Sequence, residues 1–334
     1  MEMSLRTNIL INMTRKNVSL KDIALAVGVS VDAVSKALRD SNQISEETKK
    51  IIKQKAKEMG YMKNPSALAL KTGHSNNIII FLNSLFNQYF SIMATHLIKE
   101  IEKRNYRSTI CFTEGFVLDV DQINVSEINQ CAAVLSLVEP TDKTVRYFKD
   151  NNIPLYIIGI KPSQDYPNYA ITDDYSGGYK VGEYFACSSF KKAAYITNSP
   201  SETSYRRRKG FIDAISSLSN KTYKSFSIED NKESYERISE IIQEENVDFV
   251  FCFSDFLGFS LRTLLHKKFR NYETVIFGFD NIAQYIEAFD PLNSVGSDVE
   301  KIASDILEHI DDYLNDRTKE KFAKSYPVKL IIQN

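Results

Sequence analysis

The sequence predicts a small all-α domain followed by a larger, doubly wound α/β domain. Residues 18–60 hold three short segments with apolar positions at helical spacing, separated by glycine and serine signals. After residue 75, apolar runs rich in Ile, Val and Phe alternate with amphipathic segments, which is typical of buried parallel strands joined by helices. The charge also divides the chain. Residues 1–74 hold 13 Lys and Arg against 7 Asp and Glu (+6), and the remainder holds 29 against 36 (−7). This asymmetry favours a phosphate-binding module attached to a domain that does not touch nucleic acid.

The first two helical segments are joined by a tight turn. Gly28 can adopt the left-handed conformation that ends a helix, and Ser30 can cap the next one. This arrangement predicts a helix-turn-helix, whose second helix enters the major groove of DNA, although any small helical hairpin shows the same spacing. The apolar positions are Leu20, Ile23, Ala24 and Val27 in the first helix and Val34, Ala37 and Leu38 in the second.

A third helix follows the pair. Ser45 caps it, Glu46 and Glu47 lie where the helix dipole favours acidic residues, and Gly60 ends it. Its predicted core positions are Ile51, Ile52, Ala56 and Met59, and lysines line the outside.

This part of the chain resembles the lactose-repressor family of bacterial transcription regulators. Three positions depart from the family pattern in ways that bear on the operator sequence: Ala33 replaces a Thr, Lys36 replaces an Arg, and Leu68 replaces a polar or basic residue. Lys63 also replaces a Pro. The matching residues are Asp22-Ile23-Ala24, Gly28-Val29-Ser30, Val34-Ser35-Lys36, Leu38, Glu47-Thr48, Gly60-Tyr61, Asn64, Ala67 and Leu70.

The resemblance implies a domain plan. Residues 18–63 form the DNA-binding headpiece, 64–74 a hinge helix and linker, and 75–334 a periplasmic-binding-protein-like sensor of two doubly wound subdomains. We expect subdomain one at 75–160 plus 293–323 and subdomain two at 161–292 plus 324–334. Residues 1–17 match no part of the family. They are predicted to be a disordered extension or an alternative start, or else a basic arm through Arg15 and Lys16.

Within the sensor, strands are predicted at 77–82, 107–112, 132–138, 154–160, 193–197, 248–253, 274–279 and 326–332. Helices are predicted at 90–104, 141–151, 175–187, 204–217, 234–245, 256–266 and 298–314. Residues 117–130 show no clear pattern.

Base reading is expected from the exposed first half of the second helix. Lys36 can donate to guanine, Val31 can lie on a thymine methyl, and Asp32 either accepts from cytosine or only complements the helix N-terminus. Phosphate contacts are expected from Lys21, Ser30, Ser35 and Asn64.

The hinge carries a sharper expectation. The family resemblance implies that two hinge helices, one per subunit, pair in the minor groove and insert Leu70 into the central base step. The alternative for Leu70 is ordinary packing between Ala67 and the core, and the spacing Asn64-x-x-Ala67-x-x-Leu70 favours DNA contact, with Ala67 counted among the DNA-binding residues. This geometry requires a homodimer on a palindromic operator, with helix 90–104 as a dimer contact.

The effector site is expected beyond the carboxyl ends of the strands, between the subdomains. Residues at family pocket positions are Tyr89, Phe90, Arg207, Asp255 and Asp280. An Arg fork with carboxylates and aromatic rings suits a polyhydroxylated effector, a sugar or sugar derivative. For Arg207 the other interpretation is a surface charge, and for Asp280 a helix cap.

Several function classes lack support. No nucleophile elbow, dinucleotide fingerprint or phosphate-binding Lys loop is present, so the sequence predicts no enzyme and no cofactor. Cys111, Cys131, Cys187 and Cys252 are far apart, as are the four histidines, which indicates neither a metal site nor disulfides. No apolar run is long enough for a membrane span or signal peptide, so we expect a cytoplasmic protein.

The predicted function is therefore an effector-controlled repressor of a sugar-utilisation operon. Two alternatives stay open: control by a protein partner such as a phosphocarrier, and a sugar-processing enzyme using carboxylates such as Asp255 and Asp280.

Overall fold

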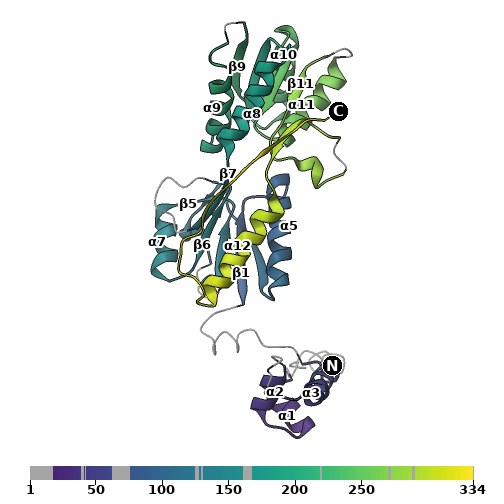
Figure 1. Cartoon of the computed structure of the whole chain (residues 1–334), viewed down its shortest axis with the longest axis vertical. Helices are drawn as coiled ribbons and strands as arrows, with labels where there is room; N and C mark the ends of the chain where they lie inside the picture. The colour runs from purple at the N-terminus through teal and green to yellow at the C-terminus, as the bar shows by residue number, and fades with distance from the viewer. Residues whose placement is uncertain are drawn as a thin grey trace, which may run out of the picture. The chain divides into compact units, whose positions relative to one another are not determined.

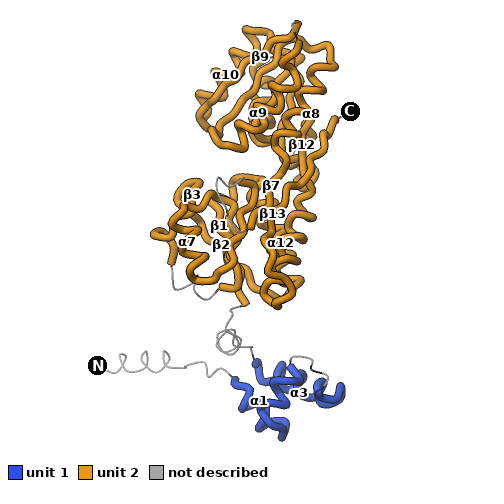
Figure 2. Tube along the Cα trace, turned by 60° about the vertical axis from the view of Figure 1, so that its left-hand side comes forward, with its two compact units in different colours: residues 1–72 blue, residues 73–334 orange. Residues whose placement is uncertain are grey.

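The computed structural model describes residues 18–38, 41, 43–61, 76–124, 128, 131–160, 168–218, 220–269, 272–287 and 290–333. The chain divides into two compact units, residues 1–72 and 73–334 (Figure 2). The expected N-terminal extension and hinge helix, including Asn64, Ala67 and Leu70, lie outside the described residues.

The first unit contains three helices, α1 (Leu20–Val27), α2 (Val31–Ala37) and α3 (Glu46–Glu58). Each begins at a serine whose side chain accepts a hydrogen bond from a backbone N–H three residues on. Gly28 ends α1 with a φ of 75°, a conformation that favours glycine. The helices enclose a small core centred on Ile23, Val34, Ala37 and Ile52, all fully buried.

Lobe one of the second unit is built on a six-stranded parallel sheet in the order β13-β7-β6-β4-β1-β2. Helices α5 (Gln88–Lys103) and α12 (Val299–Leu314) pack side by side on it (Figure 1). The lobe also contains helix α7 (Asp142–Asp150). The strands are β1 (Asn77–Leu82), β2 (Arg107–Phe112), β4 (Ala133–Ser136), β6 (Leu155–Ile158), β7 (Asn168–Thr172) and β13 (Ala323–Tyr326).

Lobe two has a four-stranded parallel sheet in the order β11-β10-β8-β9. Its strands are β8 (Lys192–Thr197), β9 (Thr222–Ser227), β10 (Phe249–Cys252) and β11 (Val275–Phe277). Its helices are α8 (Asp174–Cys187), α9 (Glu202–Ile215), α10 (Lys232–Glu244), α11 (Asp255–Lys268) and the short η2 (Ile282–Gln284). An antiparallel pair, β12 (Ser294–Gly296) with β14 (Lys329–Ile331), completes the lobe.

The segment without a clear sequence pattern is ordered by packing against lobe one. Strand β3 (Val117–Leu118) pairs with β5 (Glu139–Pro140), and η1 (Val120–Gln122) follows. The N–H of Val120 donates to the buried Thr144 hydroxyl at 2.7 Å. Long-range pairing, rather than local periodicity, therefore fixes this segment.

Strand pairing corrects the three expected crossings between the subdomains, at residues 160, 292 and 323. Strand β7 lies in the first sheet, so the first crossing falls at 172–174. Strand β12 pairs with β14, and Asn293 bridges to Phe277 of β11, so the second falls at 296–299. Strand β13 pairs with β7, so the third falls at 326–329, where the yellow chain in Figure 1 passes between the lobes. The alternation of strand and helix does not encode which sheet a strand joins.

Candidate functional site

The recognition surface of the headpiece begins at Ser30. Its hydroxyl accepts a hydrogen bond from Ala33 N–H at 3.1 Å, so the side chain caps α2. The next residue, Val31, is 44% exposed although it is a large apolar residue, as a base-contacting side chain must be. The interior side of α2 is occupied by Val34 and Ala37.

Asp32 and Lys36 lie one helical turn apart and form an ion pair at 2.8 Å. Lys36 Nζ is therefore held beside Asp32. Lys21 is exposed on α1, and Ser35 is half-buried on α2. The roles in DNA binding that the sequence assigned to these residues stay predictions.

In the second unit the two sheets present their carboxyl edges to each other. All six strands of lobe one are parallel, and the chain leaves that sheet for lobe two at the carboxyl ends of β7 and β13. In lobe two, Phe253 follows β10 and Asp280 follows β11. Ligands of such sheets bind beyond these ends.

Arg207 is the centre of a buried charged cluster at the lobe-two edge. Its side chain is 7% exposed, Nε donates to Asp174 Oδ1 at 2.9 Å, and a terminal nitrogen donates to the Phe253 carbonyl at 2.6 Å. A second terminal nitrogen lies 3.5 Å from Asp280 Oδ1. The guanidinium carbon lies 3.5 Å from the centre of the Phe279 ring and 4.9 Å from that of Phe253. The alternative of a surface charge is therefore excluded for Arg207.

Burial dominates the electrostatics of this cluster. It raises the pKa of Asp280 to about 7 and also raises the pKa of Asp174, and in both cases Arg207 acts in the opposite direction. For Arg207, burial lowers the pKa, but the carboxylates of Asp174 and Asp280 raise it above its ordinary value. The positive charge of Arg207 is thus already balanced by carboxylates of its own lobe.

Close contact between α8 and α9 positions Arg207. A Cβ on Gly178 would lie 1.8 Å from the Arg207 carbonyl oxygen, and one on Gly210 would lie 2.1 Å from the Tyr175 carbonyl oxygen. Glycine at both positions lets the helix backbones touch, which brings Arg207 to Asp174 at the start of α8.

The sequence predicted Asp255 as an effector contact. In the structure its carboxylate is bonded to groups of lobe two. Its carboxylate accepts from Ile282 N–H at 2.7 Å and from the Ser294 hydroxyl at 2.6 Å, and the residue is 1% exposed. Burial raises its pKa well above the ordinary value. Asp255 therefore connects α11, η2 and β12 within lobe two, which is a structural role for its carboxylate.

Tyr89 is a lobe-one residue that lies near the cluster. Burial raises its pKa and the nearby charge of Asp280 raises it further, whereas Arg207 lowers it. A Cβ on Gly159, after β6, would lie 3.7 Å from the Tyr89 ring. Phe90 and Tyr89 both pack against the core, with their rings 6.2 Å apart.

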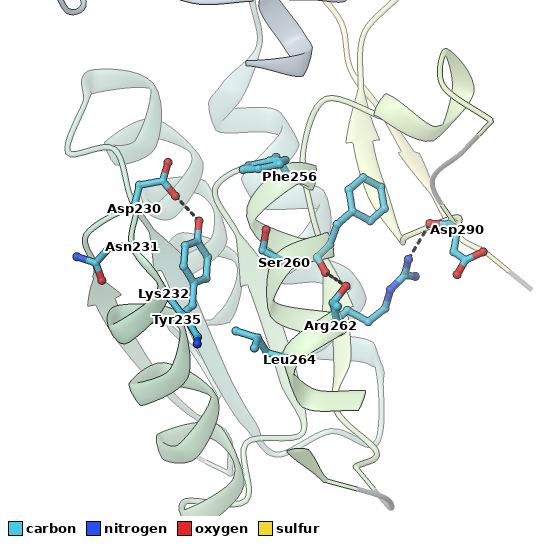
Figure 3. A pocket seen from close by; sticks show the side chains of 11 residues that line it. Asp230, Asn231, Lys232, Tyr235, Phe256, Ser260, Arg262, Leu264 and Asp290 are labelled. Carbon is cyan, nitrogen blue, oxygen red and sulfur yellow. Dashed lines mark hydrogen bonds between the residues drawn. The ribbon is translucent and has the colours of Figure 1, made fainter. Parts of the chain in front are cut away.

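A separate groove of about 570 Å³ lies between α10 and α11 and is shown in Figure 3. Its polar groups bond mainly to the protein: Tyr235 donates to Asp230 at 2.7 Å, and Arg262 donates to the carbonyls of Asp290 and Pro291. None of the effector contacts predicted from the sequence lines this groove.

Sequence reasoning missed several members of the cluster. Asp174 is not among the predicted contacts, and the sequence predicts Phe253 and Phe279 only as strand residues. The available signal was position, because all three lie one or two residues after the end of a strand.

No group of three or more His, Cys, Asp and Glu in the described ranges is arranged to hold a metal ion. Likewise, no helix in the described segments has both the length and the apolar character of a membrane span.

The headpiece and the two-lobed unit together define a helix-turn-helix DNA-binding protein with an attached periplasmic-binding-protein-like domain. Residues 19–64 match the family model described as "Bacterial regulatory proteins, lacI family". The match covers the three helices of the first unit.

Relatives are distant but span nearly the whole chain. The transcriptional repressor PurR of Pasteurella multocida is 20% identical over 94% of this chain and 97% of its own length. The ribose operon repressor of Lactococcus lactis is 23% identical over 94% and 96%. Among solved structures, the lac repressor dimer bound to operator and an anti-inducer has a TM-score of 0.73 at 14% identity, covering 95% of this chain and 98% of that one.

Proposed function

We propose that this protein is a transcription repressor that binds a palindromic operator as a homodimer and responds to a small effector bound between its lobes. The observation that carries the proposal is the pairing of two sites on separate units. The headpiece exposes Val31, Asp32 and Lys36 on one capped helix, and the sensor holds Arg207 at a sheet edge facing the other lobe. A repressor of this kind acts in the cytoplasm and needs no catalytic group.

The effector class follows from the cluster and from the relatives. Carboxylates, a guanidinium and stacked rings are the groups that bind polyhydroxylated molecules. Two structural neighbours are described with a bound cellobiose and a bound ribose. We propose a sugar or sugar derivative that shifts the operator affinity because it binds one arrangement of the lobes more tightly than the other.

The dimer contact expected on helix 90–104 stays a prediction. The outward positions of α5 include Thr95, Lys99 and Glu102, which are polar. Large exposed apolar side chains of lobe one instead lie after β1 and at the end of β2, at Phe86, Phe112 and Phe116.

The test of DNA binding starts from selection of duplexes from a random pool by the purified full chain. We expect Lys36→Ala to reduce the free-energy preference for one base at one half-site position by about 1–3 kcal/mol. This preference is measured by fluorescence anisotropy on operator variants that differ by a single base. Lys57→Ala, an exposed lysine on α3, is the matched control and should keep the preference. A uniform loss across all duplexes would make Lys36 a phosphate contact, and selection of no sequence by the wild type would contradict operator binding.

A further inference from the structure

Arg206, next to Arg207 on α9, has a half-buried side chain with no partner. Its Nε is buried without a hydrogen bond, and neither an ion pair nor a hydrogen bond to its guanidinium is found among the described residues. An unpaired, partly desolvated cation is costly, so such a group is normally paired in a finished site.

The nearest carboxylate does not satisfy it. The positive charge of Arg206 lowers the pKa of Asp174, which shows that the two groups are close. Asp174 Oδ1, however, already accepts from Arg207 Nε at 2.9 Å and from the Thr172 hydroxyl at 3.3 Å. The other two carboxylates are also engaged. Asp280 pairs with Arg207. Asp255 accepts hydrogen bonds from Ile282 N–H and from the Ser294 hydroxyl.

The facing edge of lobe one carries a complementary feature. Asn83 directly follows β1, at the carboxyl edge that faces lobe two, and its Oδ1 is buried without a hydrogen bond. The two unpaired buried atoms found in the described part of the chain are this acceptor and the Arg206 Nε donor. One lies on each lobe.

We propose that Arg206 binds an acidic group of the effector, so that the effector is a polyhydroxylated anion, a sugar carboxylate or sugar phosphate. The inference rests on the proposed function, because it names the ligand class of the same interlobe site. Arg207 is less suited to an anion, since three of its N–H groups donate to Asp174, Asp280 and the Phe253 carbonyl and the two carboxylates balance its charge. Arg206 has its donors free, and Asn83 offers an acceptor for a ligand hydroxyl.

The test compares matched neutral and acidic ligands on the full chain by isothermal titration calorimetry. The pairs are glucose with glucuronate and glucose 6-phosphate, galactose with galacturonate, and ribose with ribose 5-phosphate. At least one acidic member should bind about tenfold or more tightly than its neutral counterpart, the scale of one charge-assisted hydrogen bond. Preference for the carboxylates or for the phosphates tells the two sources of charge apart.

Arg206→Gln should abolish that ratio while the neutral sugar keeps its affinity. Arg208→Gln is the matched control. Arg208 lies two residues on, lines a different cavity of about 430 Å³ with Tyr195 and Ser225, and should leave the ratio unchanged. Thermal unfolding of each variant checks that it folds.

Three results overturn the proposal: equal affinities within every pair, binding of neutral members only, or binding of none. An acidic preference that survives in Arg206→Gln also overturns it. Selection of a defined operator by the same preparations separates these outcomes from failure of the proposed function, because operator binding does not require Arg206.

Discussion

The facing edges of the two lobes carry different kinds of chemical group. Lobe two contributes a buried ionic cluster, in which Arg207 bonds to Asp174 and lies over Phe279. Lobe one contributes an uncharged amide and a phenol, Asn83 and Tyr89. The contrast teaches that lobe two carries a preformed ionic cluster tied to its folding, whereas the groups of lobe one are uncharged and, under the proposed function, act as ligand contacts.

The largest expected effect is on the stability of lobe two. Arg207→Met keeps the length of the side chain but leaves the buried Asp174 and Asp280 without their cation. We expect a loss of about 3–5 kcal/mol in the free energy of unfolding, measured by urea denaturation. Lys209→Met, an exposed cation two residues on, should cost less than about 1 kcal/mol. Equal stability of Arg207→Met and wild type would mean that the cluster does not hold the lobe.

A smaller effect is expected from separating the helices that carry the cluster. Gly178→Ala places a Cβ 1.8 Å from a carbonyl oxygen of α9, so the backbones must move apart. Overpacking of this kind costs about 1–3 kcal/mol and shifts Arg207 from Asp174. Unfolding midpoints and effector affinity should both fall. Retention of both would show that α8 and α9 tolerate the extra atom.

In lobe one we expect a substitution to change effector binding more than stability. Tyr89→Ala is expected to weaken effector binding by about 1–2 kcal/mol, because an aromatic contact is lost, with a smaller change in unfolding free energy. Calorimetry and urea denaturation on the same sample give the two numbers. A loss confined to stability would remove Tyr89 from the ligand contacts and would break the comparison between the lobes.

A further expected effect is a dependence of stability on pH. Burial raises the pKa of Asp280 to about 7 from an unfolded value near 4, so the folded chain binds a proton more tightly between these limits. The contribution of Asp280 to stability is therefore full below pH 4 and is lost as the pH rises through 7. Asp280→Asn should flatten the dependence of the urea midpoint on pH between 4 and 7. An unchanged slope would assign the dependence to other groups.

Much of the fold was predictable because the central strands are apolar runs. Strands 77–82 and 107–112 were predicted with the bounds that the structure shows. Strand β9 was missed because it lies at a sheet edge with a polar sequence, Thr222 to Ser227, and carries no apolar run. Strand β7 was missed too, and pairing with β6 and β13 places it in the first sheet.

The sequence placed the candidate carboxylates after strands but did not separate their environments. Asp255 and Asp280 both follow strands, and the sequence treated them alike. Tertiary partners separate them: two hydrogen bonds from its own lobe engage Asp255, whereas Asp280 lies beside Arg207 and raises the pKa of Tyr89 in the facing lobe. Which carboxylate is structural depends on neighbours far along the chain, and no local pattern carries that information.

The most direct test of the account joins its two sites in one titration. The operator selected by the full chain is held at a fixed concentration, and its dissociation constant is measured by fluorescence anisotropy with and without a ligand found by calorimetry. The account predicts a change of about tenfold or more, within the usual range of coupling between two sites. It also predicts that a variant with lost effector affinity, such as Tyr89→Ala, needs correspondingly more ligand for the same change. Identical operator affinity at saturating ligand would contradict an effector-controlled repressor.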